Sequence, residues 1–174
     1  GEEIVFAHKP SPLLDDGDLT DISTVPADSG AITSLVSQPG SDNSPIFTAD
    51  GKHVVFLSEG GQPEPIGLSD AYMISSSGGK ITPLAKSFDR NIGSLLKGDN
   101  KNSVYFSEGR RTLSAFYELP LNGDAPKRIT PNDALYSFAQ GPTNGKIAFT
   151  KQRSNSFEEV YVSPIGKMNA KKIS

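Results

Sequence analysis

Short runs rich in Val, Ile, Phe and Tyr follow one another along the whole chain, separated by Gly and Pro. Within the runs apolar and polar residues tend to alternate, as they do in a strand with one buried face. No window keeps apolar residues at the i, i+3, i+4, i+7 spacing of an amphipathic helix. The sequence therefore predicts an all-β protein with almost no helix.

One strand ends in phenylalanine four times, at Phe6, Phe56, Phe106 and Phe149, at intervals of 50, 50 and 43 residues. Each is followed by a second alternating strand and then by a third short strand. The second strands are predicted at 21–25, 71–74, 116–119 and 160–162, and the third at 31–33, 80–82, 128–130 and 172–174. An innermost strand precedes the phenylalanine strand at 45–47, 92–95 and 136–139, but there is no room for one before Phe6.

A repeat of about 40–50 residues with four strands is typical of β-propeller blades, which bury their faces by stacking on one another. A β-sandwich would not repeat the same strands in the same order. We predict about four consecutive four-stranded antiparallel blades, at about 1–38, 39–86, 87–132 and 133–174. Four blades are at the low end for a closed propeller, and the first blade lacks a strand. We therefore expect a single partial domain, excised from a larger propeller.

Composition excludes several classes of function. The 174 residues are 35% hydrophobic and carry a net charge of -3. With no long apolar run and no dense basic surface, neither a membrane nor a nucleic acid is an expected partner. Cysteine is absent, so there is no disulfide, thiolate metal site or cysteine nucleophile. This composition slightly favours a periplasmic or secreted protein, and no cofactor is expected.

The segment 44–56 resembles the PD40 (WD40-like) repeat, which reads roughly Pro-x-aromatic-Ser-Pro-Asp-Gly-Lys-x-Ile-aliphatic-Phe. Asp50-Gly51 lies between two predicted strands, and Asp-Gly favours a two-residue hairpin turn. Thr48-Ala49 stand where the family has Ser-Pro. The later blades keep only Asn100-Lys101 and Asn144-Gly145-Lys146 at this turn.

Such repeats build TolB-like propellers and the N-terminal propeller of prolyl-oligopeptidase-type serine peptidases. Residues 21–30 are similar to a stretch of the peptidase propellers that reads Asp-aliphatic-aromatic-Val-Val-Pro-Ala-x-Gly-Gly, and the long loop from His8 to Thr20 also resembles theirs. In those enzymes, which include dipeptidyl and acylaminoacyl peptidases, the propeller caps an α/β-hydrolase domain and admits only oligopeptides.

The resemblance implies a non-catalytic segment that gates and orients peptide substrates for a hydrolase domain absent from this chain. The alternative is a TolB-like periplasmic propeller that acts as a protein–protein interaction scaffold. The expected partner is accordingly a peptide substrate, a partner protein or the hydrolase domain of the same parent chain. A carbohydrate-active propeller would need clustered acids or a metal site at the channel mouth, and the sequence shows neither.

No residue is predicted to be catalytic. Gly67-Leu68-Ser69-Asp70-Ala71 is the nearest approach to a Gly-x-Ser-x-Gly nucleophile elbow, but it lacks the final glycine and precedes a strand instead of a helix. His8 and His53 both precede Ser69, and no histidine follows it to act as its base. We expect both histidines to be ordinary strand residues.

No metal, amine or phosphate site is predicted either. Asp15-Asp16-Gly17-Asp18 with Asp21 does not follow the EF-hand order, so a solvated acidic loop is expected. Glu2-Glu3 opens a strand, unlike the helical acidic pair that binds the substrate amine in dipeptidyl peptidases. Gly60-Gly61 and Gly78-Gly79 lie in loops with no helix after them, unlike phosphate-binding loops.

The sequence also predicts where three repeated tyrosines and one pair of arginines lie. Tyr72, Tyr117 and Tyr161 occupy one strand position in three successive blades, and such repeated aromatics pack between blades. Arg110-Arg111 is the candidate for contact with a substrate carboxylate or a partner domain, although a solvated loop is the commoner place for such a pair.

Overall fold

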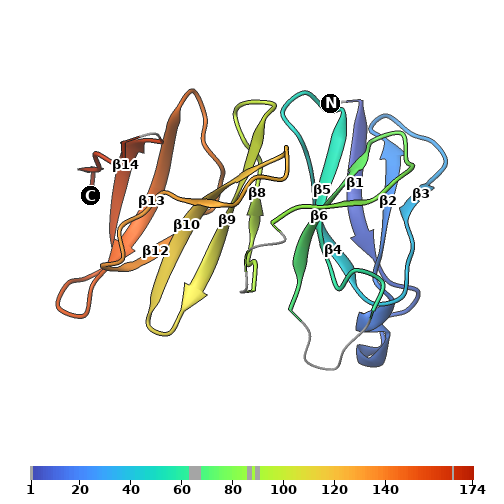
Figure 1. The fold of residues 1–174 in the computed structure, drawn as a ribbon, viewed down its shortest axis with the longest axis horizontal. Helices are drawn as coiled ribbons and strands as arrows, with labels where there is room; N and C mark the ends of the chain where they lie inside the picture. The colour runs from blue at the N-terminus through green and yellow to red at the C-terminus, as the bar shows by residue number, and fades with distance from the viewer. Residues whose placement is uncertain (1, 63–67, 86–87, 89–90, 166) are drawn as a thin grey trace.

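The computed structural model describes residues 2–62, 68–85, 88, 91–165 and 167–174. In these residues the chain forms fifteen β-strands, arranged in four antiparallel sheets that follow one another along the chain, and one short 3-10 helix (Figure 1). The predicted all-β fold of consecutive blades is confirmed, with three strands in the first blade and four in each later one. Within this part of the chain no helix is long and apolar enough to cross a membrane.

Each blade is ordered by sequence, so that every strand pairs with the next. The first blade consists of β1 (Glu3–His8), β2 (Asp21–Pro26) and β3 (Thr33–Val36), with the 3-10 helix η1 (Leu14–Leu19) between β1 and β2. The second consists of β4 (Asp42–Phe47), β5 (His53–Ser58), β6 (Asp70–Ser75) and β7 (Thr82–Pro83). The third consists of β8 (Leu95–Leu96), β9 (Ser103–Arg110), β10 (Leu113–Pro120) and β11 (Lys127–Arg128). The fourth consists of β12 (Leu135–Ser137), β13 (Lys146–Gln152), β14 (Glu159–Pro164) and β15 (Lys171–Lys172).

A phenylalanine and a tyrosine stand opposite each other in three of the blades. The pairs are Phe56 and Tyr72, Phe106 and Tyr117, and Phe149 and Tyr161, with ring centroids 6.0, 5.0 and 5.8 Å apart. Each pair packs in a core cluster that also contains side chains of the preceding blade. The prediction that the three tyrosines pack between blades is confirmed. In the first blade Ser23 takes the tyrosine position opposite Phe6.

The apolar core of the described residues lies between successive blades, and its character changes along the chain. Between the first and second blades it is largely aliphatic, with Ile22, Val36, Val54 and Ile74 around Phe56. Between the third and fourth blades it is mostly aromatic, with rings from both blades in contact. These rings belong to Tyr105, Phe116, Tyr136, Phe138, Phe149 and Tyr161. Burial of one such side chain contributes about 1.5–3 kcal/mol, so these contacts hold the blades together.

The outer strands of the blades begin and end at other residues than the sequence predicts. Ile32 and Ile173 lie just outside β3 and β15, and they are 64% and 60% exposed. An outer strand pairs with only one neighbour, and its other edge faces no further strand of the blade. Burial therefore constrains its position less than that of a central strand. The shift between Ile22 and Ser23 in the β2–β3 pairing is part of the same irregularity.

The predicted two-residue turn at Asp50-Gly51 is wrong, because β4 and β5 are joined by five residues, 48–52. Thr48 stabilises this longer turn: its hydroxyl donates to Asp50 Oδ1 at 2.8 Å and accepts from the His53 N–H at 3.2 Å. A tight turn does occur at Asn144-Gly145, where both residues have positive φ (51° and 69°). Two positive φ angles define the type I′ hairpin turn.

Candidate functional site

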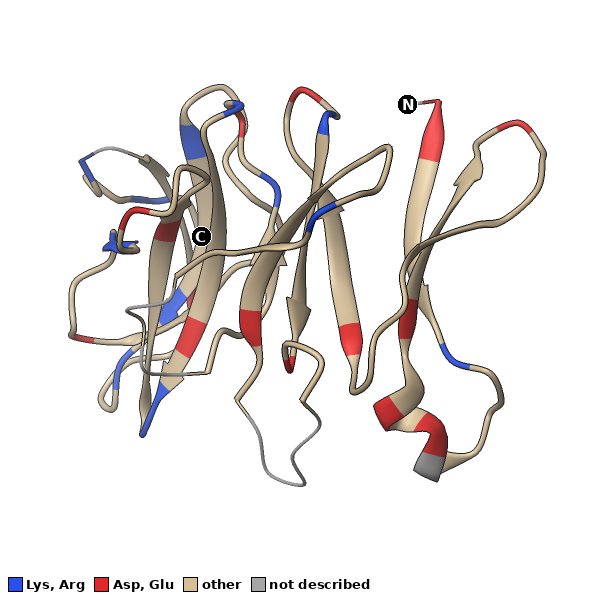
Figure 2. Cartoon of the chain, turned by 45° about the vertical axis from the view of Figure 1, so that its right-hand side comes forward, with Lys and Arg blue, Asp and Glu red and all other residues tan. Residues whose placement is uncertain are grey.

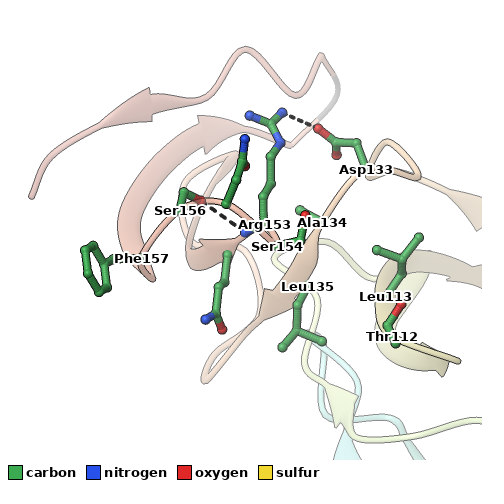
Figure 3. A pocket seen from close by; sticks show the side chains of 11 residues that line it. Thr112, Leu113, Asp133, Ala134, Leu135, Arg153, Ser154, Ser156 and Phe157 are labelled. Carbon is green, nitrogen blue, oxygen red and sulfur yellow. Dashed lines mark hydrogen bonds and ion pairs between the residues drawn. The ribbon is translucent and has the colours of Figure 1, made fainter.

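A cleft of about 720 Å³ opens at one end of the third and fourth blades (Figure 3). Its walls are residues 112–113 of the β9–β10 turn, 133–135 at the start of β12, and 152–157 of the β13–β14 loop. These segments meet because successive strands of a blade are antiparallel. The turn after the second strand and the link into the next blade therefore leave from the same end.

Asp133 is the centre of a hydrogen-bond network in this cleft. Tyr136 donates from its hydroxyl to Asp133 Oδ1 at 2.5 Å, and Lys151 donates from Nζ to Oδ2 at 3.0 Å. The Arg153 guanidinium also donates to Oδ2, across the cleft wall (Figure 3). The Lys151 ammonium lies 5.3 Å from the centroid of the Tyr136 ring, within the range of a cation–π contact.

The same network sets the protonation states of its members. Partial burial by itself raises the pKa of Asp133, but the hydrogen bonds from Tyr136, Arg153 and Lys151 outweigh it and hold that pKa far below its usual value. Burial and the bond to the Asp133 carboxylate raise the pKa of Tyr136 above its usual value of 10. At neutral pH Asp133 is therefore ionised and Tyr136 is a fixed donor. This carboxylate has its charge balanced by two cations.

A second hollow of about 310 Å³ adjoins the cleft and shares Thr112 and Leu113 with it. Its other lining residues are Arg110, Arg111 and Asn132. Both arginines are exposed, Arg111 with a positive φ of 55° at the tip of the β9–β10 turn, and neither forms an ion pair with any described residue. The sequence-predicted candidate Arg110-Arg111 thus lies next to the cleft.

Charge is unevenly distributed along the chain. Residues 1–86 hold 12 acidic and 4 basic side chains, whereas residues 87–174 hold 8 acidic and 13 basic ones. Figure 2 shows this difference in space: acidic residues dominate the first blade, beside the N-terminus, and basic residues gather on the later blades. The small net charge of -3 hides this separation.

A second polar cluster lies at the same end of the first and second blades. Asp42, Ser58 and Asp70 stand side by side across β4, β5 and β6. Gln38 donates from Nε2 to Asp42 Oδ1 and to Ser58 Oγ, both at 2.9 Å. Asp42 is fully buried, and its Oδ2 has no hydrogen-bond partner among the described residues.

No basic side chain of the described residues pairs with this second cluster. Burial raises the pKa of Asp42, and its hydrogen bonds to Ser58 and Gln38 only partly oppose that effect, while nearby Asp21 adds to it. Burial also raises the pKa of Asp70. The carboxyl groups of Asp42 and Asp70 therefore hold their protons to a higher pH than usual, in contrast to the ionised Asp133. Among the described residues no three His, Asp or Glu side chains are grouped as metal ligands.

The structure separates the residues of the weak nucleophile motif. Ser69 directly precedes β6, where Asp70 pairs with Ser58, whereas His53 pairs with Ser75 at the far end of the same ladder. Five residues of strand separate the two ends, about 17 Å. His8 lies in the first blade, where its Nε2 is 2.8 Å from Ser23 Oγ. Gly67 lies outside the described residues.

The acidic loop before β2 is partly ordered by its own contacts. It contains η1, where Asp16 accepts a hydrogen bond from Ser11, and Thr20 donates to the Gly17 carbonyl at 2.7 Å. Glu3 is exposed in β1, where it pairs with Pro26, and Asp21 accepts from Ser37 at 3.1 Å. Among the described side chains, these acids are not grouped into one metal-binding site.

Four further residues of the polar ends were missed by the sequence analysis: Asp133, Arg153 and Phe157 at the cleft, and Asp42 in the buried cluster. The repeat held a usable signal, because the second residue after each repeated phenylalanine is polar in every blade. These residues are His8, Ser58, Glu108 and Lys151. Of these, Ser58 and Glu108 are buried, and a polar position that recurs beside the core indicates a polar layer at one end of the blades.

No protein-family model matches the sequence, and no curated protein matches it either. The fold is similar to that of a protein assigned as TolB from Agrobacterium tumefaciens, with a TM-score of 0.74 and 15% identity over 99% of this chain and 61% of that one. It is also similar to an acylaminoacyl peptidase from Pyrococcus horikoshii, with a TM-score of 0.71 and 15% identity over 100% of this chain and 26% of that one.

A third similar structure is the β-propeller domain of the Trilobed protease from Pyrococcus furiosus, with a TM-score of 0.68 and 14% identity over 99% of this chain and 49% of that one. The chain therefore spans less than two thirds of each of these proteins. At such identities the likeness concerns the fold. The chain has the fold of consecutive β-propeller blades, of the kind found in TolB and in the propellers of prolyl-oligopeptidase-type peptidases.

Proposed function

We propose that this chain is the non-catalytic propeller segment of a prolyl-oligopeptidase-like serine peptidase of the dipeptidyl or acylaminoacyl type. In this role it admits peptides and orients them for a serine nucleophile on an α/β-hydrolase domain. The observation that carries the proposal is the cleft of about 720 Å³ between the third and fourth blades, which is lined by apolar side chains and Arg153 and adjoins the hollow lined by Arg110 and Arg111.

This cleft fits a peptide in size and in chemistry. Pockets of about 300–1,000 Å³ hold ligands of the size of a short peptide segment, and orientation comes from a few polar groups among apolar ones. Leu113, Leu135 and Phe157 supply the apolar surface, and Arg153 supplies hydrogen-bond donors. The similarity of the whole chain to propeller-bearing peptidases supports the assignment to this class.

The second candidate function is that of a TolB-like propeller that acts as a protein–protein interaction scaffold. It is favoured by the TM-score of 0.74 to the Agrobacterium protein, of which this chain matches 61%. In this function the same cleft would hold a segment of a partner protein. Neither candidate assigns a nucleophile to this chain.

The two functions are separated by the size and the reactivity of the native protein. We would capture it from its source with an antibody to this chain, measure its intact mass, and treat it with a fluorophosphonate, which labels activated serines. A chain several times heavier that takes the label supports the peptidase. A chain of about this size or double, without label, overturns the peptidase proposal in favour of the scaffold.

A further inference from the structure

The cleft and its arginine rim have a chemistry that selects one class of ligand. Asp133 already accepts hydrogen bonds from Tyr136, Lys151 and Arg153, so its carboxylate is not available to bind an external cation. Arg110 and Arg111 are exposed and form no ion pair with described residues. The charges that remain available at the cleft are therefore positive.

Arg153 adds a partly engaged guanidinium at the opposite wall. One of its NH2 groups bonds to Asp133, which fixes the side chain, yet that side chain is still 51% exposed. A guanidinium has five N–H donors, so donors remain for a second carboxylate. Arg110, Arg111 and Arg153 thus lie around the cleft and its adjoining hollow. The carboxylate in the cleft wall, that of Asp133, already has its charge balanced. The excess of basic residues in 87–174 places this border in the positive half of the chain.

Large apolar side chains lie exposed in the same place. Phe157 on the β13–β14 loop is 90% exposed, and Leu135 at the start of β12 is 46% exposed. Both line the cleft together with Leu113 of the third blade, and Figure 3 shows Phe157 on the loop at the far side from Leu113. Exposed apolar residues beside polar ones mark interaction surfaces, and aromatic residues with Arg are enriched at their centres.

We propose that this cleft binds an acidic peptide segment in which carboxylates alternate with large apolar side chains. Arg110, Arg111 and Arg153 bind the carboxylates, and Leu135 and Phe157 cover an apolar side chain between them. A nucleic acid fits less well, because its phosphates match the arginines but offer no aliphatic side chain to Leu113 and Leu135. The inference rests on the peptide-binding part of the proposed function, and it holds for a peptidase or a scaffold alike.

The test uses four fluorescein-labelled peptides of equal length on one Gly-Ser background. They carry Glu with Leu, Glu with Ser, Gln with Leu, or Gln with Ser at the same positions, so that charge and apolar surface vary separately. Binding to the 174-residue chain is measured by fluorescence anisotropy at fixed salt. We expect the peptide with Glu and Leu to bind about tenfold more tightly than either peptide with one feature, since each feature meets its own group of residues.

Variants locate the site. Arg110→Ala with Arg111→Ala should weaken binding of the Glu and Leu peptide about tenfold, and Phe157→Ala about fivefold. The control is Lys52→Ala with Lys101→Ala, which removes two exposed charges from turns at the opposite end of the blades and should leave the affinity within twofold. Circular dichroism checks that every variant is folded.

Three results would overturn the inference. The first is equal binding of all four peptides, and the second is an equal loss for the arginine and lysine variants. The third is displacement of the labelled peptide by a single-stranded oligonucleotide at lower concentration than by unlabelled peptide. Because these measurements need only this chain, their failure is distinct from failure of the peptidase proposal, which depends on the labelled serine of the native protein.

Discussion

Asp42 and Asp133 lie at the same end of two blade interfaces, Asp42 as the first residue of β4 and Asp133 two residues before β12. At Asp133 two cations and a tyrosine hydroxyl compensate the charge, and the carboxylate stays ionised. At Asp42 complete burial outweighs the hydrogen bonds from two neutral partners and favours the protonated acid. Two carboxyl groups at the same end of the blades therefore differ in charge state, and the neighbours of each decide which state it takes.

The consequence for function differs between the two interfaces. A compensated carboxylate tolerates water, so Asp133 can form the wall of an open cleft and hold Arg153 in place. No cation lies beside Asp42 among the described residues, so its complete burial favours the neutral acid, and a smaller hollow of about 260 Å³ is lined by its partner Gln38. The larger of the two hollows, about 720 against about 260 Å³, thus lies at the third–fourth interface, beside the compensated carboxylate.

The largest expected effect concerns the apolar parts of these interfaces. Phe116 is fully buried and stacks on Tyr105 and Phe138 at 5.4 and 4.0 Å, so Phe116→Ala should lower the free energy of unfolding by about 3–5 kcal/mol. Ile22→Ala at the first–second interface removes less surface, and about 2–4 kcal/mol is expected. Urea unfolding followed by circular dichroism measures both. A larger loss at Ile22 would contradict the importance given to the aromatic cluster.

An intermediate effect is expected for Asp133→Asn, which removes the charge that holds Lys151 and Arg153. The loss of charge-assisted hydrogen bonds should cost about 1–2 kcal/mol at pH 7, a value reduced because the side chain is 34% exposed. Asp28→Asn in an exposed turn is the control and should change stability by less than about 0.5 kcal/mol. Equal effects of the two substitutions would show that the hydrogen bonds of Asp133 do not contribute to the free energy of unfolding.

The smallest effect at neutral pH is expected for Asp42→Asn, which should be within about 1 kcal/mol of wild type and on the stabilising side. The native state binds the Asp42 proton more tightly than the unfolded chain, whose usual pKa is 3.8. Ionised Asp42 therefore lowers the free energy of unfolding as pH rises from 3.8 through the native pKa. Asn keeps an oxygen that can accept from Gln38 and removes the buried charge.

The pH profiles of the two variants should differ in sign. In Asp133 the native pKa is lowered, so its stabilisation is present above 3.8 and is lost as pH falls through the native pKa. Relative to wild type, Asp42→Asn should therefore gain stability mainly at neutral pH, and Asp133→Asn should lose it mainly at neutral pH. Unfolding midpoints in urea from pH 7 down to about 2 test this, and parallel profiles would be evidence against the assigned charge states.

Much of the fold could be predicted because the residues that recur in the sequence are residues that lie buried in the blades. Phe56, Phe106 and Phe149 recur with the strand that carries them, and a buried strand must keep its register to keep its apolar face inside. Ile32 and Ile173 misled the prediction, since they recur in sequence but lie beyond the outer strands. An outer strand pairs with only one neighbour, so a recurring isoleucine does not determine where that strand ends.

The candidate site was less predictable for a physical reason. Asp133 and Arg153 are 20 residues apart, so their ion pair depends on the antiparallel pairing of β12 with β13, in which Leu135 lies opposite Gln152. Only Arg110-Arg111 stood out in sequence, because two adjacent charges need no fold to be noticed. Asp42 gave no signal, since nothing in its sequence neighbourhood distinguishes a buried carboxylate from a solvated one.

The shortness of the outer strands also protects the molecule from unwanted association. β7, β11 and β15 are two residues long, so each offers few free N–H and C=O groups to a strand of another chain. Pro83 in β7 lacks a donor altogether, and the lysines and arginine of β11 and β15 repel a like-charged edge. The blade edges are thus poor templates for aggregation or amyloid growth, even though the sheets themselves are rich in β-branched and aromatic residues.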